Sequence, residues 1–293
     1  MDNWKSYHIF YHDGLLQERL ICECIYPLMK ELKDGGSISK WFFIRYWEGG
    51  PHIRLRFLPI KDVENQVVSR ISTFLEENKA QITISREEYY KNQKFDGKPL
   101  DVSTLPWFEN NSIVPVDYER ELERYGGENT IPYCESIFMV TSDYAARIID
   151  ATKDSMSKRI SISIDLIMVF LNQMDINIIP FFYYYGKLWT EYFADERSVN
   201  AIKTVNAKAR INRLIVQGEK GEIIKNWERD LKPYVDAIKD IWKDDDTKLY
   251  SLAISLVHMF NNRLGIVPDL ERQIAIQIAR EGEAYEYTME NRA

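Results

Sequence analysis

The sequence is poor in the residues that build disulfide-stabilised or zinc-stabilised folds. Its 293 residues include three cysteines and four histidines, and the histidines are scattered singly. Cys22 and Cys24 are too close together for an ordinary bridge, and no two cysteines have the CxxC spacing that is typical of a metal site. The sequence therefore argues against a disulfide framework and against structural zinc.

Long apolar runs and a basic excess are also missing. No run approaches the roughly 18 apolar residues that indicate a membrane span, and the N-terminus lacks the basic start and apolar core of a signal peptide. We therefore expect a cytoplasmic protein with no membrane partner. The net charge is −7, whereas proteins that bind a phosphate backbone usually carry a basic excess. We therefore expect no direct binding of tRNA.

Motifs for nucleotide, serine-hydrolase and metalloprotease chemistry are absent as well. The sequence contains no P-loop, no GxGxxG, no GxSxG and no HExxH. We therefore expect no cofactor and no catalytic metal. Apolar residues make up 45% of the chain, which is enough to build a substantial core.

The first part of the chain alternates between strand-like and helix-like patterns. Period-two alternation predicts strands at 6–12, 41–46, 53–58, 81–85 and 113–116. Apolar stripes predict helices at 15–32 and 61–77. The order βαββαβ of the first six elements is typical of a ferredoxin-like half. Residues 86–112 break the periodicity, and we interpret them as an insertion or a long loop.

After Thr130 the pattern becomes helical throughout. Predicted helices cover 133–149, 160–172, 181–193, 198–216, 223–242, 248–263 and 270–287. The sequence therefore predicts an α+β fold in a single domain, 1–293, in which a mixed or antiparallel sheet layer packs against a helical half. The sheet-rich part covers 1–129 and the helical part covers 130–293.

One group of candidate site residues lies in the segment FFIRYWEGGPHIRLRF and comprises Arg45, His52, Arg54 and Arg56. Alternate strand residues share a face, so the last three should point to one side. The intervening apolar residues should face the core: Ile53, Leu55 and Phe57. A row of arginines suits carboxylates or phosphates. The alternative interpretation is a solvated face with ordinary ion pairs.

Four further candidates lie elsewhere in the chain. Arg124 precedes the paired glycines of YERELERYGG, which predict a tight turn, although an exposed charged turn is the alternative. His258 stands beside an apolar helical stripe, near Arg263, and is a natural proton carrier or a satisfied structural residue. Trp107 either lines a peptide groove or covers the edge of the core.

Taken together, three segments resemble one family. WFFIRYWEGGPHIRLRF, YERELERYGG and SLVHMFNNRLG occur in the order and rough spacing of the C-terminal domain of lantibiotic dehydratases. That domain also occurs alone in thiopeptide-type bacteriocin clusters. In the full-length enzymes, an N-terminal domain transfers glutamate from glutamyl-tRNA onto a serine or threonine of a precursor peptide. The C-terminal domain then eliminates glutamate, which leaves dehydroalanine or dehydrobutyrine.

The resemblance implies an elimination site at the matching positions Arg54, Arg56, Arg124 and His258, with Arg56, Arg124 and His258 as the catalytic residues. The arginines would hold the free carboxylate of the glutamyl ester and stabilise developing negative charge, and His258 would carry the proton. We expect these four residues to converge on one cleft. Further residues are expected to bind substrate: Arg45, His52, Arg54, Arg263 and Trp107.

The resemblance also implies partners and alternatives. The expected partners are a precursor peptide, with its leader and core, and a separate protein that performs glutamylation. Some stand-alone members of the family are pyridine synthases, which join two dehydroalanines in a formal [4+2] cycloaddition and release the leader peptide. A non-catalytic scaffold that binds the leader peptide is the third hypothesis. The insertion at 86–112 is longer than we expect in a fused dehydratase.

Overall fold

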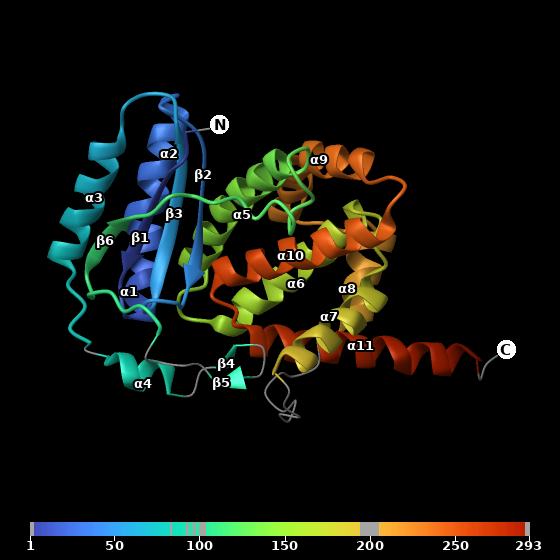
Figure 1. The fold of residues 1–293 in the computed structure, drawn as a ribbon. Helices are drawn as coiled ribbons and strands as arrows, with labels where there is room; N and C mark the ends of the chain where they lie inside the picture. Colours follow the sequence, from blue (N-terminus) through green and yellow to red (C-terminus); the bar gives the residue numbers. More distant parts are fainter. Residues whose placement is uncertain are drawn as a thin grey trace. The chain divides into compact units, whose positions relative to one another are not determined.

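The computed structural model describes residues 3–82, 84–91, 94–95, 98–99, 104–193 and 205–290 (Figure 1). Internal contacts divide the chain into two compact units. The sheet unit comprises Met1–Leu122, Glu135–Lys153 and Asn262–Gly265. The helical unit comprises Glu123–Cys134, Asp154–Asn261 and Ile266–Ala293. One predicted helical segment, Glu135–Lys153, therefore belongs with the sheet and not with the other helices.

The sheet unit contains one antiparallel sheet with the strand order β2-β3-β1-β6. Its strands are β1 (Lys5–Phe10), β2 (Ile38–Tyr46), β3 (His52–Pro59) and β6 (Ser112–Pro115). The central position of β3, between β1 and β2, is the split βαβ arrangement of ferredoxin-like folds. The predicted α+β class, the β2–β3 hairpin and the strand at 113–116 are confirmed.

The predicted strand at 81–85 is wrong, because the described residues of this segment pair with no strand. Side-chain amides take up the backbone groups here. Asn111 accepts from the Ala80 N–H at 2.8 Å, and Asn110 donates to the carbonyl oxygens of Ala80 and Ile82 at 3.3 and 3.1 Å. These bonds, between residues far apart in the sequence, occupy backbone groups that a strand ladder would otherwise pair. The edge position of the sheet is filled by β6.

Helices cover the face of the sheet that carries Ile53, Leu55 and Phe57. All three side chains have no solvent exposure, as the alternation predicts. The predicted helix at 15–32 is one continuous helical run with a π-helical segment in its middle. The helices of this part are α1 (Gly14–Arg19), η1 (Leu20–Ile25), α2 (Tyr26–Asp34) and α3 (Glu64–Glu77). Among their contacts, α2 packs on β2, and α3 packs on η1 and β6.

The expected insertion at 86–112 is described in part. It contains the short helix α4 (Arg86–Tyr90) and the small strands β4 (Lys94–Phe95) and β5 (Lys98–Pro99). The turn expected at 96–97 lies outside the described residues. The buried Tyr90 hydroxyl accepts from the Gly49 N–H at 2.6 Å and donates to the Pro106 carbonyl at 3.2 Å. This segment is therefore tied to the β2–β3 turn.

The remaining predicted helices are confirmed, except that the one expected at 198–216 is helical in the described residues only from Ala207, after Asn206 with a left-handed φ of 58°. They are α5 (Ile131–Ala151), α6 (Met156–Gln173), α7 (Ile178–Phe193), α8 (Ala207–Ile211) with η2 (Asn212–Val216), α9 (Glu222–Ile241), α10 (Asp246–Leu264) and α11 (Pro268–Glu290). The start of the helix expected at 198–216 lies outside the described residues. Helices α7 and α11 pack closely, because Gly186 has no side chain and a Cβ there would lie only 3.2 Å from the Ile276 side chain.

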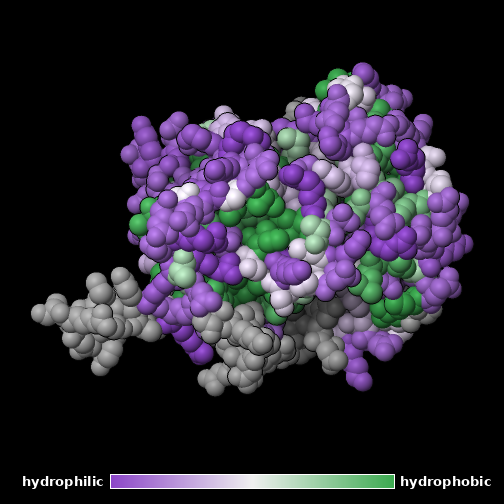
Figure 2. All heavy atoms as spheres, turned by 180° about the vertical axis from the view of Figure 1, so that it is seen from behind, coloured by the Kyte–Doolittle hydropathy of each residue, from purple (hydrophilic) through white to green (hydrophobic). Residues whose placement is uncertain are grey.

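In the described part of the chain no single helix has the length and apolar character to cross a membrane, although α6 and α7, bent by 115°, meet those criteria as a pair. The face drawn in Figure 2 is mainly hydrophilic, with hydrophobic residues gathered in separate patches. Leu15 is among the exposed large apolar side chains, at 76% exposure.

Replacing Leu55 by alanine should destabilise the protein by about 2–5 kcal/mol, because the change opens a cavity between the sheet and its helices. Urea unfolding followed by circular dichroism measures the loss. The matched control is Leu15→Ala, which removes the same atoms from an exposed site and should change the free energy of unfolding by less than about 0.5 kcal/mol. Equal effects of the two substitutions would contradict this account of the core.

Candidate functional site

The first cluster lies on the face of the sheet opposite Ile53, Leu55 and Phe57. His8 of β1 stands directly across from Arg54, and Phe10 stands across from His52. The His8 and His52 rings stack with centroids 4.8 Å apart. The alternation along β3 therefore brings His52, Arg54 and Arg56 to one side, as predicted, and adds His8, which the sequence reasoning did not single out.

The two histidines of this cluster are neutral at physiological pH. The Arg54 Nε donates to His52 Nε2 at 3.2 Å, so the ring proton of His52 lies on Nδ1, which is 2.8 Å from the Gly50 carbonyl oxygen. Burial lowers the pKa of His52 to about 4. Burial and the neighbouring Arg54 charge lower the pKa of His8 to about 3. The positive charge of this face therefore resides on the arginines.

Aromatic rings hold both arginines. The guanidinium of Arg54 lies 3.4 Å from the centroid of the Tyr46 ring, and that of Arg56 lies 4.5 Å from the centroid of Tyr118. Within the residues that the structure describes, Arg54 forms no ion pair with a carboxylate. Guanidinium groups held against aromatic rings in this way suit the binding of a carboxylate or phosphate.

Arg45 and Arg263 do not join this cluster. Arg45 pairs across from Ile53 on the core side of the sheet, where its Nε donates to the Arg263 carbonyl oxygen at 3.2 Å. The side chain of Arg263 is 1% exposed and donates to Ser142 Oγ at 3.0 Å. The structure therefore corrects the grouping of Arg45 with Arg54, and it gives both Arg45 and Arg263 packing contacts.

Trp107 covers the turn between β2 and β3. It forms an isolated bridge with Gly49, and its ring lies 5.0 Å from His12 and 5.9 Å from Tyr90 between centroids. Of the two alternatives for Trp107, these contacts favour a cover over the edge of the core.

The second cluster lies in the helical unit. Arg124 Nε donates to Ser255 Oγ of α10 at 3.3 Å. Ser255 and His258 are three residues apart on α10, a spacing that places both on one face of a helix. The structure therefore brings Arg124 and His258 to the same stretch of α10.

His258 belongs to a hydrogen-bonded network that the sequence reasoning missed. Its Nδ1 lies 2.9 Å from Glu271 Oε1. Glu271 Oε2 accepts from the Tyr185 hydroxyl and from Asn261 Nδ2. The His258 side chain is 21% exposed and that of Glu271 is fully buried. The sequence did hold a signal for Glu271, because this residue lies on the same apolar stripe of α11 as Ile274. A carboxylate at such a buried position needs hydrogen-bond partners.

The arginines of β3 lie in the sheet unit, whereas Arg124 and His258 lie in the helical unit. The expected convergence of Arg54, Arg56, Arg124 and His258 on one cleft stays a prediction.

The paired glycines after Arg124 form the predicted turn. Gly126 and Gly127 have φ angles of 80° and 82°, a region that side chains disfavour. A Cβ on Gly126 would lie 3.0 Å from Thr130 Oγ1 and 3.2 Å from the Trp242 ring, whereas nothing lies within 4 Å of one on Gly127. Gly126 is therefore required both for its backbone conformation and for space.

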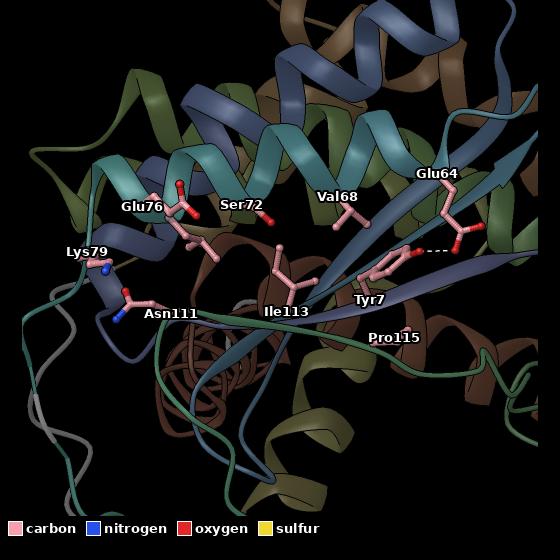
Figure 3. Close-up of a pocket in the computed structure, with 10 residues that line it drawn as sticks. Tyr7, Glu64, Val68, Ser72, Glu76, Lys79, Asn111, Ile113 and Pro115 are labelled. Carbon is pink, nitrogen blue, oxygen red and sulfur yellow. Dashed lines mark hydrogen bonds between the residues drawn. The ribbon is translucent and has the colours of Figure 1, made fainter.

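A pocket of about 490 Å³ lies beside the edge strand of the sheet, between α3 and β6 (Figure 3). Its middle is apolar, with Val68 and Ile113, and Figure 3 shows Tyr7 with Glu64 at one end and Lys79 with Asn111 at the other. No residue predicted for the site lines this pocket, so it is separate from the arginine cluster.

The chain matches the family model described as lantibiotic biosynthesis dehydratase, C-terminal, over residues 4–280. It is 28% identical to the epidermin biosynthesis protein EpiB of Staphylococcus epidermidis over 176 residues, which are 58% of this chain and 15% of EpiB. It is 25% identical to the nisin biosynthesis protein NisB of Lactococcus lactis subsp. lactis over 259 residues, which are 84% of this chain and 22% of NisB. The chain thus spans under a quarter of both relatives.

Solved structures share the fold at lower sequence identity. The pyridine synthase TbtD from thiomuracin biosynthesis matches with a TM-score of 0.65 and 16% identity, covering 94% of this chain and 96% of TbtD. The tRNA-dependent lantibiotic dehydratase MibB from Microbispora sp. 107891 matches with a TM-score of 0.58 and 17% identity, covering 94% of this chain and 27% of MibB. TsrL matches with a TM-score of 0.59 and 16% identity, over 96% of this chain and 95% of TsrL.

Substituting Gly127 by alanine should destabilise the protein by about 1–2 kcal/mol, because a side chain is strained in the left-handed region. Gly126→Ala should cost about 1–3 kcal/mol more, because its Cβ also overpacks Thr130 and Trp242. Chemical denaturation of the two variants beside the unsubstituted protein measures both losses. If both variants lose the same stability, space at Gly126 is not the constraint.

The neutral histidines of the sheet face predict a dependence of stability on pH. Their pKa values in the folded protein, about 3 for His8 and about 4 for His52, lie below the ordinary 6.5. The unfolded chain therefore binds these protons first, and the free energy of unfolding falls as the pH is lowered from about 6.5 towards 4. His8→Asn should flatten this slope in urea melts between those pH values. An unchanged slope would show that His8 is not held neutral by the fold.

Proposed function

Because the chain belongs to the lantibiotic biosynthesis dehydratase C-terminal family, we propose that it modifies a ribosomally made precursor peptide. Its reaction is the elimination of glutamate from glutamylated serine or threonine, which leaves dehydroalanine or dehydrobutyrine. The partners are the precursor peptide, with its leader and core, and a separate protein that performs glutamylation.

The observation that carries this proposal is that Arg124 hydrogen-bonds Ser255 of α10, three residues before His258 on the same helix. The partly exposed His258 takes the α-proton of the esterified residue, and the electron pair of that C–H bond forms the new C=C bond. The bond between Cβ of the esterified serine or threonine and the ester oxygen breaks, and glutamate leaves with that oxygen as a carboxylate. Arg124, held at Ser255, stabilises the negative charge that develops on the peptide carbonyl.

The arginines of β3 supply the second half of the proposal. The glutamyl ester carries a free carboxylate, and a guanidinium held on an aromatic ring binds a carboxylate with little loss of side-chain entropy. Arg54 and Arg56 are stacked in this way on Tyr46 and Tyr118. Since both neighbouring histidines are neutral, this carboxylate receptor keeps its charge across the physiological pH range.

A reaction with glutamylated peptide tests the proposal. The unsubstituted protein should remove glutamate, and mass spectrometry should show the corresponding mass loss. His258→Ala or Arg124→Ala should slow this loss by roughly 10²–10⁴-fold, because each removes a group that acts on the transition state, so glutamylated peptide accumulates. Arg229→Ala, which breaks an exposed pair with Asp230, is the control and should leave the rate unchanged.

The second candidate is a pyridine synthase, favoured by the match of the fold to nearly the full length of TbtD. This activity requires no glutamylated substrate. A peptide that already carries two dehydroalanines would be cyclised with release of its leader, and that outcome would replace elimination as the function. If neither peptide changes in mass, the protein is a non-catalytic scaffold and both enzyme hypotheses fail.

A further inference from the structure

The fully buried carboxylate of Glu271 lies 2.9 Å from Nδ1 of His258. We propose that Glu271 is a positioning residue that fixes the tautomer of His258, so that Nε2 carries the lone pair used in the reaction. This inference deepens the proposed function, because it rests on His258 as the proton carrier. Glu271 does not act on the substrate itself, since its side chain has no exposed surface.

The hydrogen bonds of Glu271 engage both of its carboxylate oxygens. Oε2 accepts from the Tyr185 hydroxyl and from Asn261 Nδ2, the latter at 3.0 Å. Oε1 lies 2.9 Å from His258 Nδ1. In the proposed arrangement Glu271 is an acceptor at both oxygens, so Nδ1 of His258 carries the ring proton. Nε2 is then the basic nitrogen.

Asn261 is hydrogen-bonded on both sides of its amide. Its Oδ1 accepts from the Ser163 hydroxyl at 2.8 Å, and its Nδ2 donates to Glu271 Oε2 at 3.0 Å. Burial and the adjacent carboxylate raise the pKa of Tyr185 well above its ordinary value, so the phenol keeps its proton and donates. Both partners of Oε2 are therefore donors, which is the arrangement that stabilises a buried negative charge.

The ring of His258 is also held sterically. Trp189 meets it edge-on, with centroids 5.0 Å apart, and the same indole lies 6.1 Å from Tyr185. A fixed ring with a carboxylate at Nδ1 accepts a proton at Nε2 without reorganisation, and the carboxylate stabilises the resulting imidazolium. A carboxylate that orients a histidine base acts in the same way in serine proteases.

Glu271→Gln is the decisive substitution, because it keeps the shape and removes the charge. The amide oxygen of glutamine satisfies Tyr185 and Asn261, so its NH₂ group faces His258 Nδ1. That nitrogen must then accept, and the ring proton moves to Nε2, the wrong tautomer for a base. We expect the maximal rate of elimination to fall by roughly 10²–10⁴-fold, with an unchanged KM.

Nitrogen-15 NMR of labelled histidine reads the tautomer in the absence of any peptide. The expected result is an Nδ1–H ring for His258 in the unsubstituted protein and an Nε2–H ring in Glu271→Gln. An Nε2–H ring in the unsubstituted protein overturns the proposal, even if the variant fails to fold. The matched control is Glu281→Gln, which alters another hydrogen-bonded carboxylate of α11, one that accepts from the N–H groups of Val205 and Ala207. It should leave the His258 tautomer and the rate unchanged.

The two proposals fail separately. An Nδ1–H tautomer in a protein that does not eliminate glutamate leaves the role of Glu271 intact and refutes the proposed reaction. Elimination that survives Glu271→Gln at its full rate, with the tautomer changed, shows that the tautomer of His258 does not limit the reaction and overturns the positioning role.

Discussion

The pleat of β3 sends alternate side chains to opposite faces of the sheet, and both the core and the candidate anion receptor follow from it. Ile53, Leu55 and Phe57 are fully buried, so Arg54 and Arg56 must emerge on the other face. A register slip of one residue would send both charges into the apolar core on the other face of the sheet. Burial of the core therefore holds the arginines in place, and ligand binding need not do so.

The second constraint is the burial of a carboxylate among helices. An unpaired buried charge costs far more than a hydrogen bond returns, so Glu271 is tolerable only with donors on both oxygens. Tyr185 and Asn261 supply one side and His258 supplies the other. The same bonds that stabilise the buried charge also orient the imidazole, so the stability of this part of the helical unit and the orientation of His258 are coupled.

Local periodicity predicted the α+β class, the hairpin and the long helices after Thr130, because those patterns depend on neighbours in sequence. It also predicted which residues of β3 share a face. It assigned no face to Arg45, because that face depends on the register of the hairpin, which pairs Arg45 with Ile53. The strand expected at 81–85 is absent from the described residues, where Asn110, distant in sequence, donates to the Ile82 carbonyl oxygen. Glu271 was missed because its partners come from α7 and α10.

In the proposed reaction, the two clusters take different chemical tasks. The sheet face holds permanent cations, since its histidines remain neutral until the pH falls to about 4 and about 3. Such a face binds an anion without exchanging protons with it. His258, the proton carrier of the proposed reaction, is in contrast partly exposed and lies against a buried carboxylate. An elimination that needs a clamp for a carboxylate and a separate proton carrier requires that these two roles fall on different groups.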